Sequence, residues 1–263
     1  MTSQKIAEIK SILDEAHDKY NTVNFIELDP ISIPHRFNTK EDIEISAFLM
    51  ATISWGQRKS ILKNGDTLMK IMDNSPYEFI VETNFEKLNS KAINSFVHRT
   101  FNAKDLLFFF RSLQKIYTKH KGLEILFSNY TSSEHAIKEG INYFRNEFLG
   151  NKLNRSFKHV SNPNENSACK RLNMFLRWMI RQDTRGVDFG IWKILNPSQL
   201  YCPLDVHSGN VARQLGILIR KQNDWKATEE LTFKLREFCF EDPIKYDFAL
   251  FGIGVNSKLD AAF

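Results

Sequence analysis

The chain contains few of the residues that shape small, turn-rich or cross-linked proteins. Its 263 residues include 3 cysteines, 11 glycines and 7 prolines. Three widely spaced cysteines provide neither a disulfide framework nor a Cys-x-x-Cys metal pair, which favours a reducing compartment. Few glycines and prolines mean few turns, and long helices need fewer turns than many short strands do. The composition therefore favours a helical, cytoplasmic protein.

Long apolar runs and metal-binding histidine patterns are also missing. No stretch reaches about 18 apolar residues, so we expect no contact with a membrane. The first twenty residues are charged and helical in pattern, unlike a secretory signal peptide. The 7 histidines are scattered without a His-x-x-x-His pair. Because a metal site needs several ligands close together, we expect no metal and no cofactor.

Charge of one sign is only mildly in excess. The net charge is +5 and the isoelectric point is about 9.0. This balance permits a nucleic acid as a partner without requiring one. Aromatic residues, by contrast, are plentiful. The 22 phenylalanines, in a chain that is 42% hydrophobic, predict a large aromatic core.

Helical patterns run along the whole chain, and no convincing strand or internal repeat is visible. Apolar residues recur at helical spacing in residues 3–20 and again in 103–120, for example. We predict an all-α fold in which residues 1–263 form one composite unit. Within it, residues from about 40 to 182 would form a helical bundle. Residues 1–39 and 183–263 would form a second helical subdomain.

A lysine stands at the start of a mostly apolar predicted helix, residues 167–182. Lys170 shares one stripe of this helix with Asn173 and Arg177. The positive end of the helix dipole and partial burial would both disfavour an ammonium group there. An uncharged amine is a nucleophile, so Lys170 is a candidate catalytic residue. The alternative is a solvated lysine whose stem covers apolar surface.

An aspartate starts another predicted helix in the segment "PLDVHSGNVARQLG". As the N-cap residue, Asp205 would accept backbone N–H bonds and face the positive end of the dipole, which keeps it ionised. It can be a structural cap, or it can also supply a fixed negative charge beside a reacting centre. These two interpretations do not exclude each other.

Together the lysine and the aspartate resemble the helix-hairpin-helix DNA glycosylases. In that superfamily a lysine on the second helix of the hairpin precedes a pattern close to V-D-T-H-hydrophobic-x-R-hydrophobic-x-x-R-L-G. The positions that match here are Asp205, His207, Val211, Arg213 and Gly216. The separation of the lysine from the aspartate is most similar to that in archaeal-type 8-oxoguanine DNA glycosylases.

Over nearly its full length the chain also resembles a family of uncharacterised conserved microbial proteins. The matching segments are "DPISIPHRF", "EISAFLMATISWGQRKSI", "KRLNMFLRWMIR", "PLDVHSGNVARQLG" and "DPIKYDFALFGIG". Together the resemblances imply a glycosylase-like fold, with two helical subdomains and a cleft between them. They further imply a monomer in the cytoplasm, associated with the nucleoid.

The function implied by the glycosylase resemblance is removal of an oxidised purine, such as 8-oxoguanine, from double-stranded DNA. The damaged nucleotide would be flipped out of the duplex into a pocket. Lys170 would attack the sugar C1′ and form a Schiff base, which permits AP-lyase cleavage of the strand. Asp205 would stabilise the positive charge that develops on the sugar and help to deprotonate the lysine.

The segment "SWGQ" is the best candidate for the base pocket. Trp55 could stack on a base, Gln57 could bond a purine edge, and Gly56 could allow close backbone approach. His207 is the fourth candidate for this pocket. For Trp55, the alternative to base stacking is packing in the core.

The loop before the lysine departs from the glycosylase pattern. The usual hairpin, Leu-Pro-Gly-hydrophobic-Gly, holds a DNA phosphate with backbone N–H groups, whereas "SNPNENSACK" has no glycine. Polar and cationic side chains would then bind DNA: Asn164, Asn166, Ser167, Arg171, Arg177 and Arg213. Two alternatives stay open, a nucleic-acid-binding protein without catalysis on the same scaffold and a hydrolase of small N-glycosides.

Overall fold

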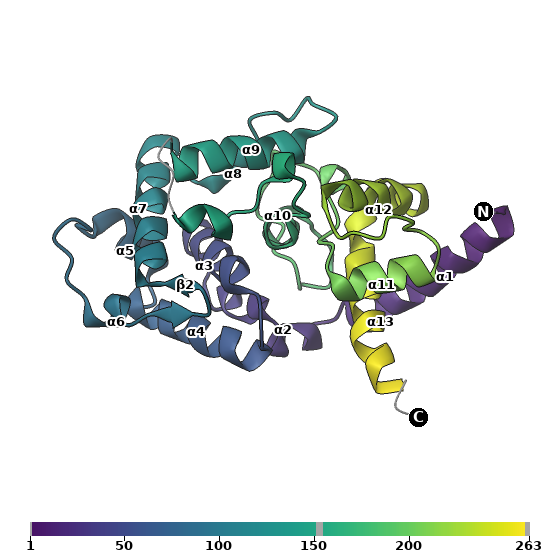
Figure 1. Cartoon of the computed structure of the whole chain (residues 1–263), viewed down its shortest axis with the longest axis horizontal. Helices are drawn as coiled ribbons and strands as arrows, with labels where there is room; N and C mark the ends of the chain where they lie inside the picture. Colours follow the sequence, from purple (N-terminus) through teal and green to yellow (C-terminus); the bar gives the residue numbers. More distant parts are fainter. Residues whose placement is uncertain (1, 151–154, 261–263) are drawn as a thin grey trace. The chain divides into compact units, whose positions relative to one another are not determined.

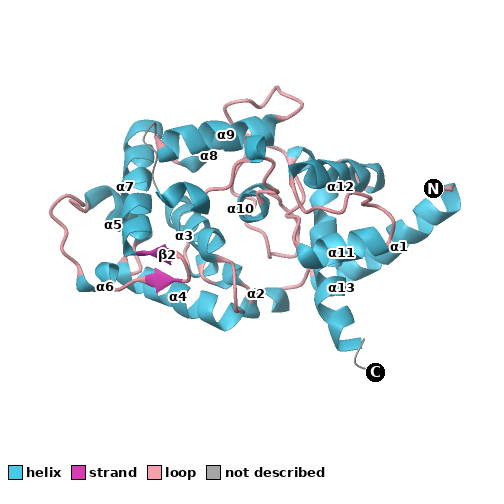
Figure 2. Ribbon diagram, in the orientation of Figure 1, coloured by secondary structure: helices cyan, strands magenta, loops and turns pink. Residues whose placement is uncertain are grey.

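The computed structural model describes residues 2–150 and 155–260, and these are mainly helical (Figure 1; Figure 2). The prediction of an all-α fold is confirmed. Among the residues described, the only strands are β1 (Val97–His98) and β2 (Phe101–Asn102), which pair antiparallel as a short hairpin. A glycosylase-like arrangement of the helices stays a prediction.

The chain divides into two compact units. The terminal unit combines Met1–Phe25 with Asn162–Phe263, and the central unit is Ile26–Ser161. This division differs from the predicted boundaries, which grouped the Lys170 helix with residues 40–182. That helix belongs to the terminal unit because its arginines are bonded to acidic side chains of residues 183–247.

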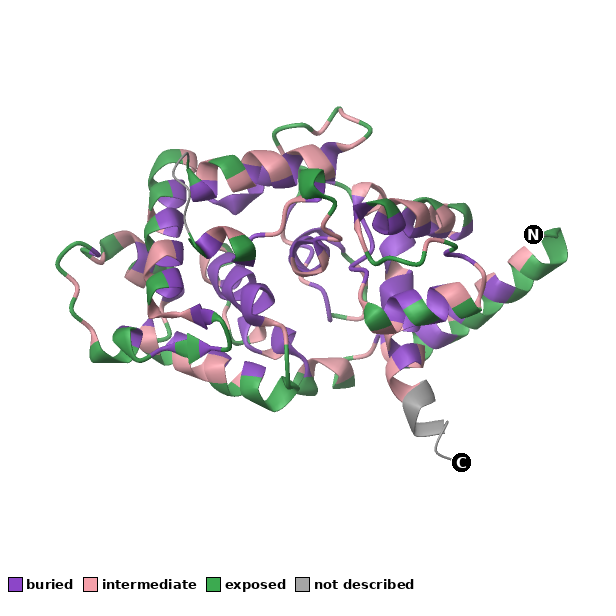
Figure 3. Ribbon diagram, viewed as in Figure 1, coloured by how far each residue is buried: buried purple, intermediate pink, exposed green. Residues whose placement is uncertain are grey.

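The central unit is built around one buried helix, α3 (Lys40–Ile53). Every residue of α3 from Ile43 to Ile53 is buried, as Figure 3 shows. The other elements surround it along the chain. They are η1 (Pro30–Ser32), η2 (Pro34–Arg36), α4 (Arg58–Ile71), α5 (Pro76–Glu82), α6 (Lys91–Asn94), the β1–β2 hairpin, α7 (Ala103–His120), α8 (Leu123–Phe127), α9 (Ala136–Leu149) and η3 (Arg155–His159).

The predicted aromatic core is present in this unit. Phe48 of α3 stacks on Phe109 of α7 with ring centroids 5.8 Å apart. Phe144 and Phe148 of α9 meet Phe48 edge to face at 5.4 and 5.3 Å. Edge-to-face and offset stacks are the favoured geometries of aromatic pairs. The phenylalanines therefore join three helices that are distant in the sequence.

The terminal unit brings the two ends of the chain together. The helix α2 (Asn24–Leu28) crosses the boundary between the units. The elements of the terminal unit are α1 (Ser3–Tyr20), η4 (Pro163–Glu165), α10 (Lys170–Ile180), η5 (Pro197–Gln199), α11 (Val206–Gln214), α12 (Trp225–Phe238), η6 (Pro243–Lys245) and α13 (Tyr246–Asp260). Helix α13 packs on both α1 and α11. Glycine makes this packing close, since a Cβ on Gly252 would lie 2.2 Å from the ring of Tyr20.

Two buried arginines fix α10 in the terminal unit. Arg177 pairs with Asp188 at 3.2 Å and with Asp247 of α13. Arg181, one turn further along, is 1% exposed and pairs with Asp188, Asp183 and Asp242. Buried charges are costly unless they are paired, so these contacts set the position of α10 against α13.

Helix packing in the central unit leaves no room for a side chain at Gly140. A Cβ there would lie 2.2 Å from the backbone oxygen of Phe127. Alanine normally favours a helix by about 1 kcal/mol over glycine, but overpacking costs about 1–3 kcal/mol. We expect Gly140→Ala to lower the free energy of unfolding by about 2 kcal/mol in urea denaturation. Asn146→Ala, at an exposed position of the same helix, is the control, and equal stability of the Gly140 variant and the wild type would refute the steric argument.

Candidate active site

Lys170 is the first residue of α10. The residue before it, Cys169, has a left-handed backbone with φ of 50°, so the chain turns sharply into the helix. The lysine side chain is 30% exposed, and its Nζ lies 3.8 Å from Sδ of Met174, one turn along. The amine is therefore only partly accessible and lies against an apolar neighbour.

Asp205 is the N-cap of α11, which confirms the predicted capping role. Its Oδ1 accepts the backbone N–H groups of His207 at 2.8 Å and Ser208 at 3.0 Å. The Ser208 hydroxyl accepts the backbone N–H of Asp205 at 3.0 Å, which completes a capping box. The cap is thus formed by one carboxylate oxygen.

The other oxygen faces the lysine. Oδ2 of Asp205 lies 3.9 Å from Nζ of Lys170, and the aspartate side chain is 22% exposed. Two residues that the sequence singled out separately therefore meet within the terminal unit. The distance is short enough for an ion pair and for a proton to pass from the amine to the carboxylate through a small movement of the lysine.

A second carboxylate belongs to the same group of charges. Burial raises the pKa of Asp247 to about 6, and Asp205 acts in the same direction, whereas Arg177 and Lys170 lower it. Burial also raises the pKa of the Cys202 thiol, and the charges of Asp247 and Asp205 reinforce the shift. Asp247 was not among the residues predicted from the sequence; its signal is a single acid directly before the apolar run "FALFGIG".

Comparison with known protein families gives a match, and it spans Lys170, Asp205 and Asp247. A family model described as "Protein of unknown function (DUF2400)" matches residues 29–256. The chain belongs to this family. No curated protein and no solved structure matches the chain. The DUF2400 match includes the lysine, both carboxylates and most of both compact units.

One residue predicted to bind DNA has a different place in this DUF2400 chain. Arg177 is 4% exposed, and its guanidinium pairs with two acids and lies over the ring of Phe248 at 4.2 Å. The prediction that Arg177 contacts DNA is therefore wrong. Its neighbours Leu176 and Trp178 are fully buried, and an arginine between them on a packed helix is buried with them.

Arg213 and Arg171 were also predicted to bind phosphate. Arg213 donates through Nε to the carbonyl of Arg220 at 2.8 Å and through Nη2 to Asn223 at 2.7 Å. It therefore holds the loop that follows α11. Arg171 is half-buried, and burial lowers the pKa of its guanidinium to about 10, which leaves it charged at neutral pH.

The loop before α10 differs from a hairpin between two α-helices. Residues 155–169 contain only the short 3-10 turns η3 and η4. Asn164 and Asn166 are exposed and Ser167 is half-buried. Asn166 has a left-handed backbone, and its Nδ2 donates to Asp224 at 3.0 Å. At least one of these polar side chains is thus used within the protein.

The predicted base-pocket residues lie in different units. Trp55, Gly56 and Gln57 follow α3 in the central unit, where the guanidinium of Arg99 lies 4.9 Å from the Trp55 ring. Gly56 has φ of 105°, and a Cβ there would lie 2.8 Å from Arg99. His207 belongs to the terminal unit and packs against Phe251 of α13 at 6.1 Å. A base-binding role for these residues stays a prediction.

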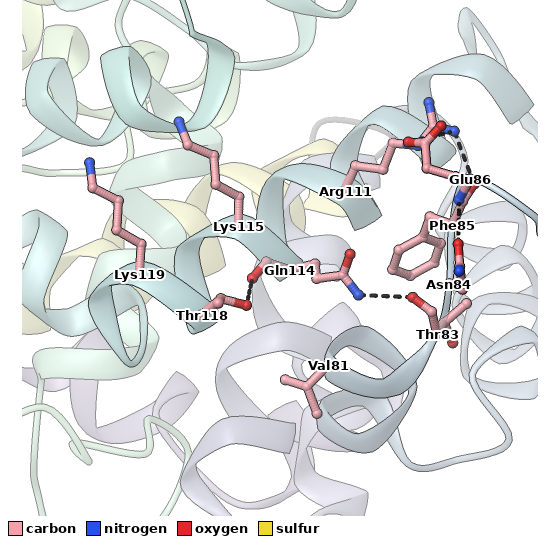
Figure 4. Close-up of a pocket in the computed structure, with 10 residues that line it drawn as sticks. All are labelled: Val81, Thr83, Asn84, Phe85, Glu86, Arg111, Gln114, Lys115, Thr118 and Lys119. Atoms are coloured by element: carbon pink, nitrogen blue, oxygen red, sulfur yellow. Dashed lines mark hydrogen bonds and ion pairs between the residues drawn. The ribbon is translucent and has the colours of Figure 1, made fainter.

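A surface pocket of about 660 Å³ lies in the central unit between α7 and the segment after α5 (Figure 4). Three cations line it, but acidic or carbonyl groups accept from each of them. Arg111 pairs with Glu86 at 3.3 Å, Lys119 pairs with Glu147 at 2.8 Å, and Lys115 donates to the Glu147 carbonyl at 3.2 Å. We assign no ligand to this pocket.

Two further observations apply to the part of the chain that the structure describes. No three histidine, cysteine, aspartate or glutamate side chains in it come together as a metal-ligand group. None of its helices is long and apolar enough to cross a bilayer.

The division of roles between the two oxygens of Asp205 can be tested by stability. Asparagine caps helices about as well as aspartate, whereas loss of a cap costs about 1 kcal/mol. We expect Asp205→Asn to unfold at nearly the wild-type urea concentration and Asp205→Ala to lose about 1 kcal/mol. Equal losses in both variants would show that the negative charge, rather than the cap, stabilises the helix.

The raised pKa of Asp247 predicts a pH-dependent stability. The folded protein keeps this proton up to about pH 6, whereas an ordinary aspartate releases it near 3.8. The stability that protonation contributes is therefore complete below pH 3.8 and is lost as the pH rises to 6. We expect the difference in unfolding free energy between wild type and Asp247→Asn to fall by up to about 3 kcal/mol over this range. A difference that does not vary with pH would contradict the shift.

Proposed function

We propose that this chain is a DNA glycosylase with AP-lyase activity that removes an oxidised purine such as 8-oxoguanine. The observation that carries the proposal is the 3.9 Å separation of Lys170 Nζ from Asp205 Oδ2. Schiff-base chemistry at a sugar needs an amine nucleophile and a fixed negative charge in one place. Each residue stands at the start of a helix, so its backbone position is well defined.

In the proposed reaction, the uncharged amine of Lys170 attacks C1′ of a nucleotide that has left the duplex. The bond from C1′ to the base breaks, and the base leaves with the electron pair and takes up a proton. The new C–N bond becomes a Schiff base when the nitrogen loses its proton and the ring oxygen leaves C1′ and is protonated. Water then takes a proton from C2′, a double bond forms between C2′ and C3′, and the 3′ phosphate leaves with the electron pair of its bond. Asp205 Oδ2 accepts the amine proton and stabilises the cationic sugar.

A basic surface in the central unit supports a nucleic-acid partner. Arg58, Lys59 and Lys63 of α4 and Arg99 of the hairpin are exposed, and none forms an ion pair with a described residue. The positive end of α4 adds to this charge. Arg99 lies 4.9 Å from the Trp55 ring. Unneutralised cations suit a phosphate backbone, and an aromatic ring suits a base.

A non-catalytic nucleic-acid-binding protein is the second candidate. The observation that favours it is the loop before α10, where the side-chain amide of Asn166 already donates a hydrogen bond to Asp224. A glycosylase that lacks the glycine hairpin needs other groups to hold the DNA near its lysine. The two candidates differ in whether Lys170 becomes covalently attached to DNA.

Borohydride trapping on a duplex with one 8-oxoguanine separates these candidates. We expect a covalent adduct with wild type, none with Lys170→Ala, and trapping slowed by about 100-fold with Asp205→Asn, a loss typical of a missing charge-stabilising group. Lys226→Ala is the matched control, because Lys226 is an exposed lysine in the first turn of another helix of the same unit.

Other outcomes decide against the proposal. DNA binding without an adduct or base release across a panel of lesions would leave the non-catalytic candidate. Base release from free nucleosides, without a preference for duplex, would indicate a hydrolase of small N-glycosides. An adduct that persists in Lys170→Ala would place the nucleophile elsewhere.

A further inference from the structure

We infer that the segment Asn223–Trp225, here called the brace, positions Lys170 and Asp205 by holding both helix starts at once. The inference rests on the proposed function, since it assigns these residues to the same site. Two side chains that the sequence suggested for DNA contact, those of Asn166 and Arg213, bond to the brace. The residues of the brace are positioning residues, because none of their described contacts is to the lysine amine or to the aspartate carboxylate.

One side of the brace holds the aspartate. Nδ2 of Asn223 donates to the backbone carbonyl of Asp205 at 2.9 Å. Oδ1 of Asn223 in turn accepts from Nη2 of Arg213 at 2.7 Å. Asn223 also lies close to the backbone of α11, since a Cβ on Gly209 would be 2.9 Å from Oδ1 of Asn223. The cap residue is thus fixed from outside its own helix.

The other side holds the loop that leads into Lys170. Oδ2 of Asp224 accepts from Nδ2 of Asn166 at 3.0 Å, and the Trp225 backbone N–H donates to the Asn166 carbonyl at 3.2 Å. Asp224 also forms an antiparallel bridge with Ser167. The hydrogen bond from Arg220 is the main reason that the pKa of Asp224 is low, about 2, so the carboxylate stays ionised.

The brace therefore connects two helix starts that are distant in the sequence. Asn223 and Asp224 are adjacent, and one reaches the Asp205 carbonyl while the other reaches the loop before Lys170. Catalytic groups need placement to a fraction of an ångström, and an error of about 1 Å can cost about 100-fold in rate. Disturbing the brace should therefore slow the reaction without weakening the binding of DNA.

Asn223→Asp breaks one contact selectively. The variant keeps an oxygen for Arg213 but loses the donor to the Asp205 carbonyl. Asn166→Gly removes the link to Asp224 and tolerates the left-handed backbone at that position, where φ is 59°. The matched control is Asn256→Asp, which loses a similar 2.9 Å bond from an asparagine to a backbone carbonyl, that of Gly252, in α13.

Single-turnover trapping gives three separate quantities: the rate constant, the amplitude and the Kd for DNA at several salt concentrations. We expect the two brace variants to lower the rate constant about 10- to 100-fold, with amplitude and Kd near those of wild type and of the control. A loss of amplitude at an unchanged rate would indicate partial unfolding and overturn the inference. A raised Kd with a smaller salt slope would show direct phosphate contact and also overturn it.

A second readout does not depend on the proposed reaction. Lysines carrying ¹³C-methyl groups from reductive methylation give NMR signals that respond to nearby charge, and Lys170→Arg assigns the signal of Lys170. We expect this signal to move in Asn166→Gly, which disturbs the brace without adding a charge, and to stay in place in Asn256→Asp. An unmoved signal overturns the brace. Absence of any adduct in wild type overturns the proposed function alone, while the NMR result still decides the brace.

Discussion

The terminal unit depends on the pairing of two buried arginines with acidic side chains. Arg177 lies in α10 and Arg181 directly follows its last residue. Their partners come from the following loop, from the residue before η6 and from α13. Removing one member of a buried pair leaves an uncompensated charge and costs about 3–5 kcal/mol. Because Asp247 is both a partner of Arg177 and a neighbour of the candidate site, the charges that hold the helices together also set the electrostatic environment of Lys170.

Local patterns in the sequence were sufficient for much of the fold. The helical spacing of residues 3–20 and 103–120 predicted α1 and α7 correctly, and the cap at Asp205 followed from its place before a helix. These features depend on residues that are close in the chain. The side chains whose partners are distant in the sequence were harder to place. Arg177 was taken for a phosphate ligand because a cation on a helix looks the same in the sequence whether an acid or solvent faces it. The boundary between the two units differs from the predicted one for the same reason, because the acids that pair with the α10 arginine lie as far along the chain as Asp247.

In the proposed site, one carboxylate would serve both a structural and a chemical task. Three of the hydrogen bonds that fix Asp205 end on Oδ1, from two backbone amides and the Ser208 hydroxyl. The other carboxylate oxygen, Oδ2, faces the Lys170 amine. An aspartate that caps a helix has its orientation fixed before any substrate arrives, so little reorganisation is needed when charge develops beside it.

The pairing of α1 with α13 has a consequence for synthesis of the chain on the ribosome. The central unit is continuous in the sequence, and all its elements are available once residue 161 has been made. The terminal unit cannot be completed then, because α1 packs on α13, which follows the central unit in the sequence. Until α13 has been made, the face of α1 that packs on it stays uncovered. Domains commonly fold in the order in which they emerge, but here α1 precedes the central unit in the sequence and its partner α13 follows it.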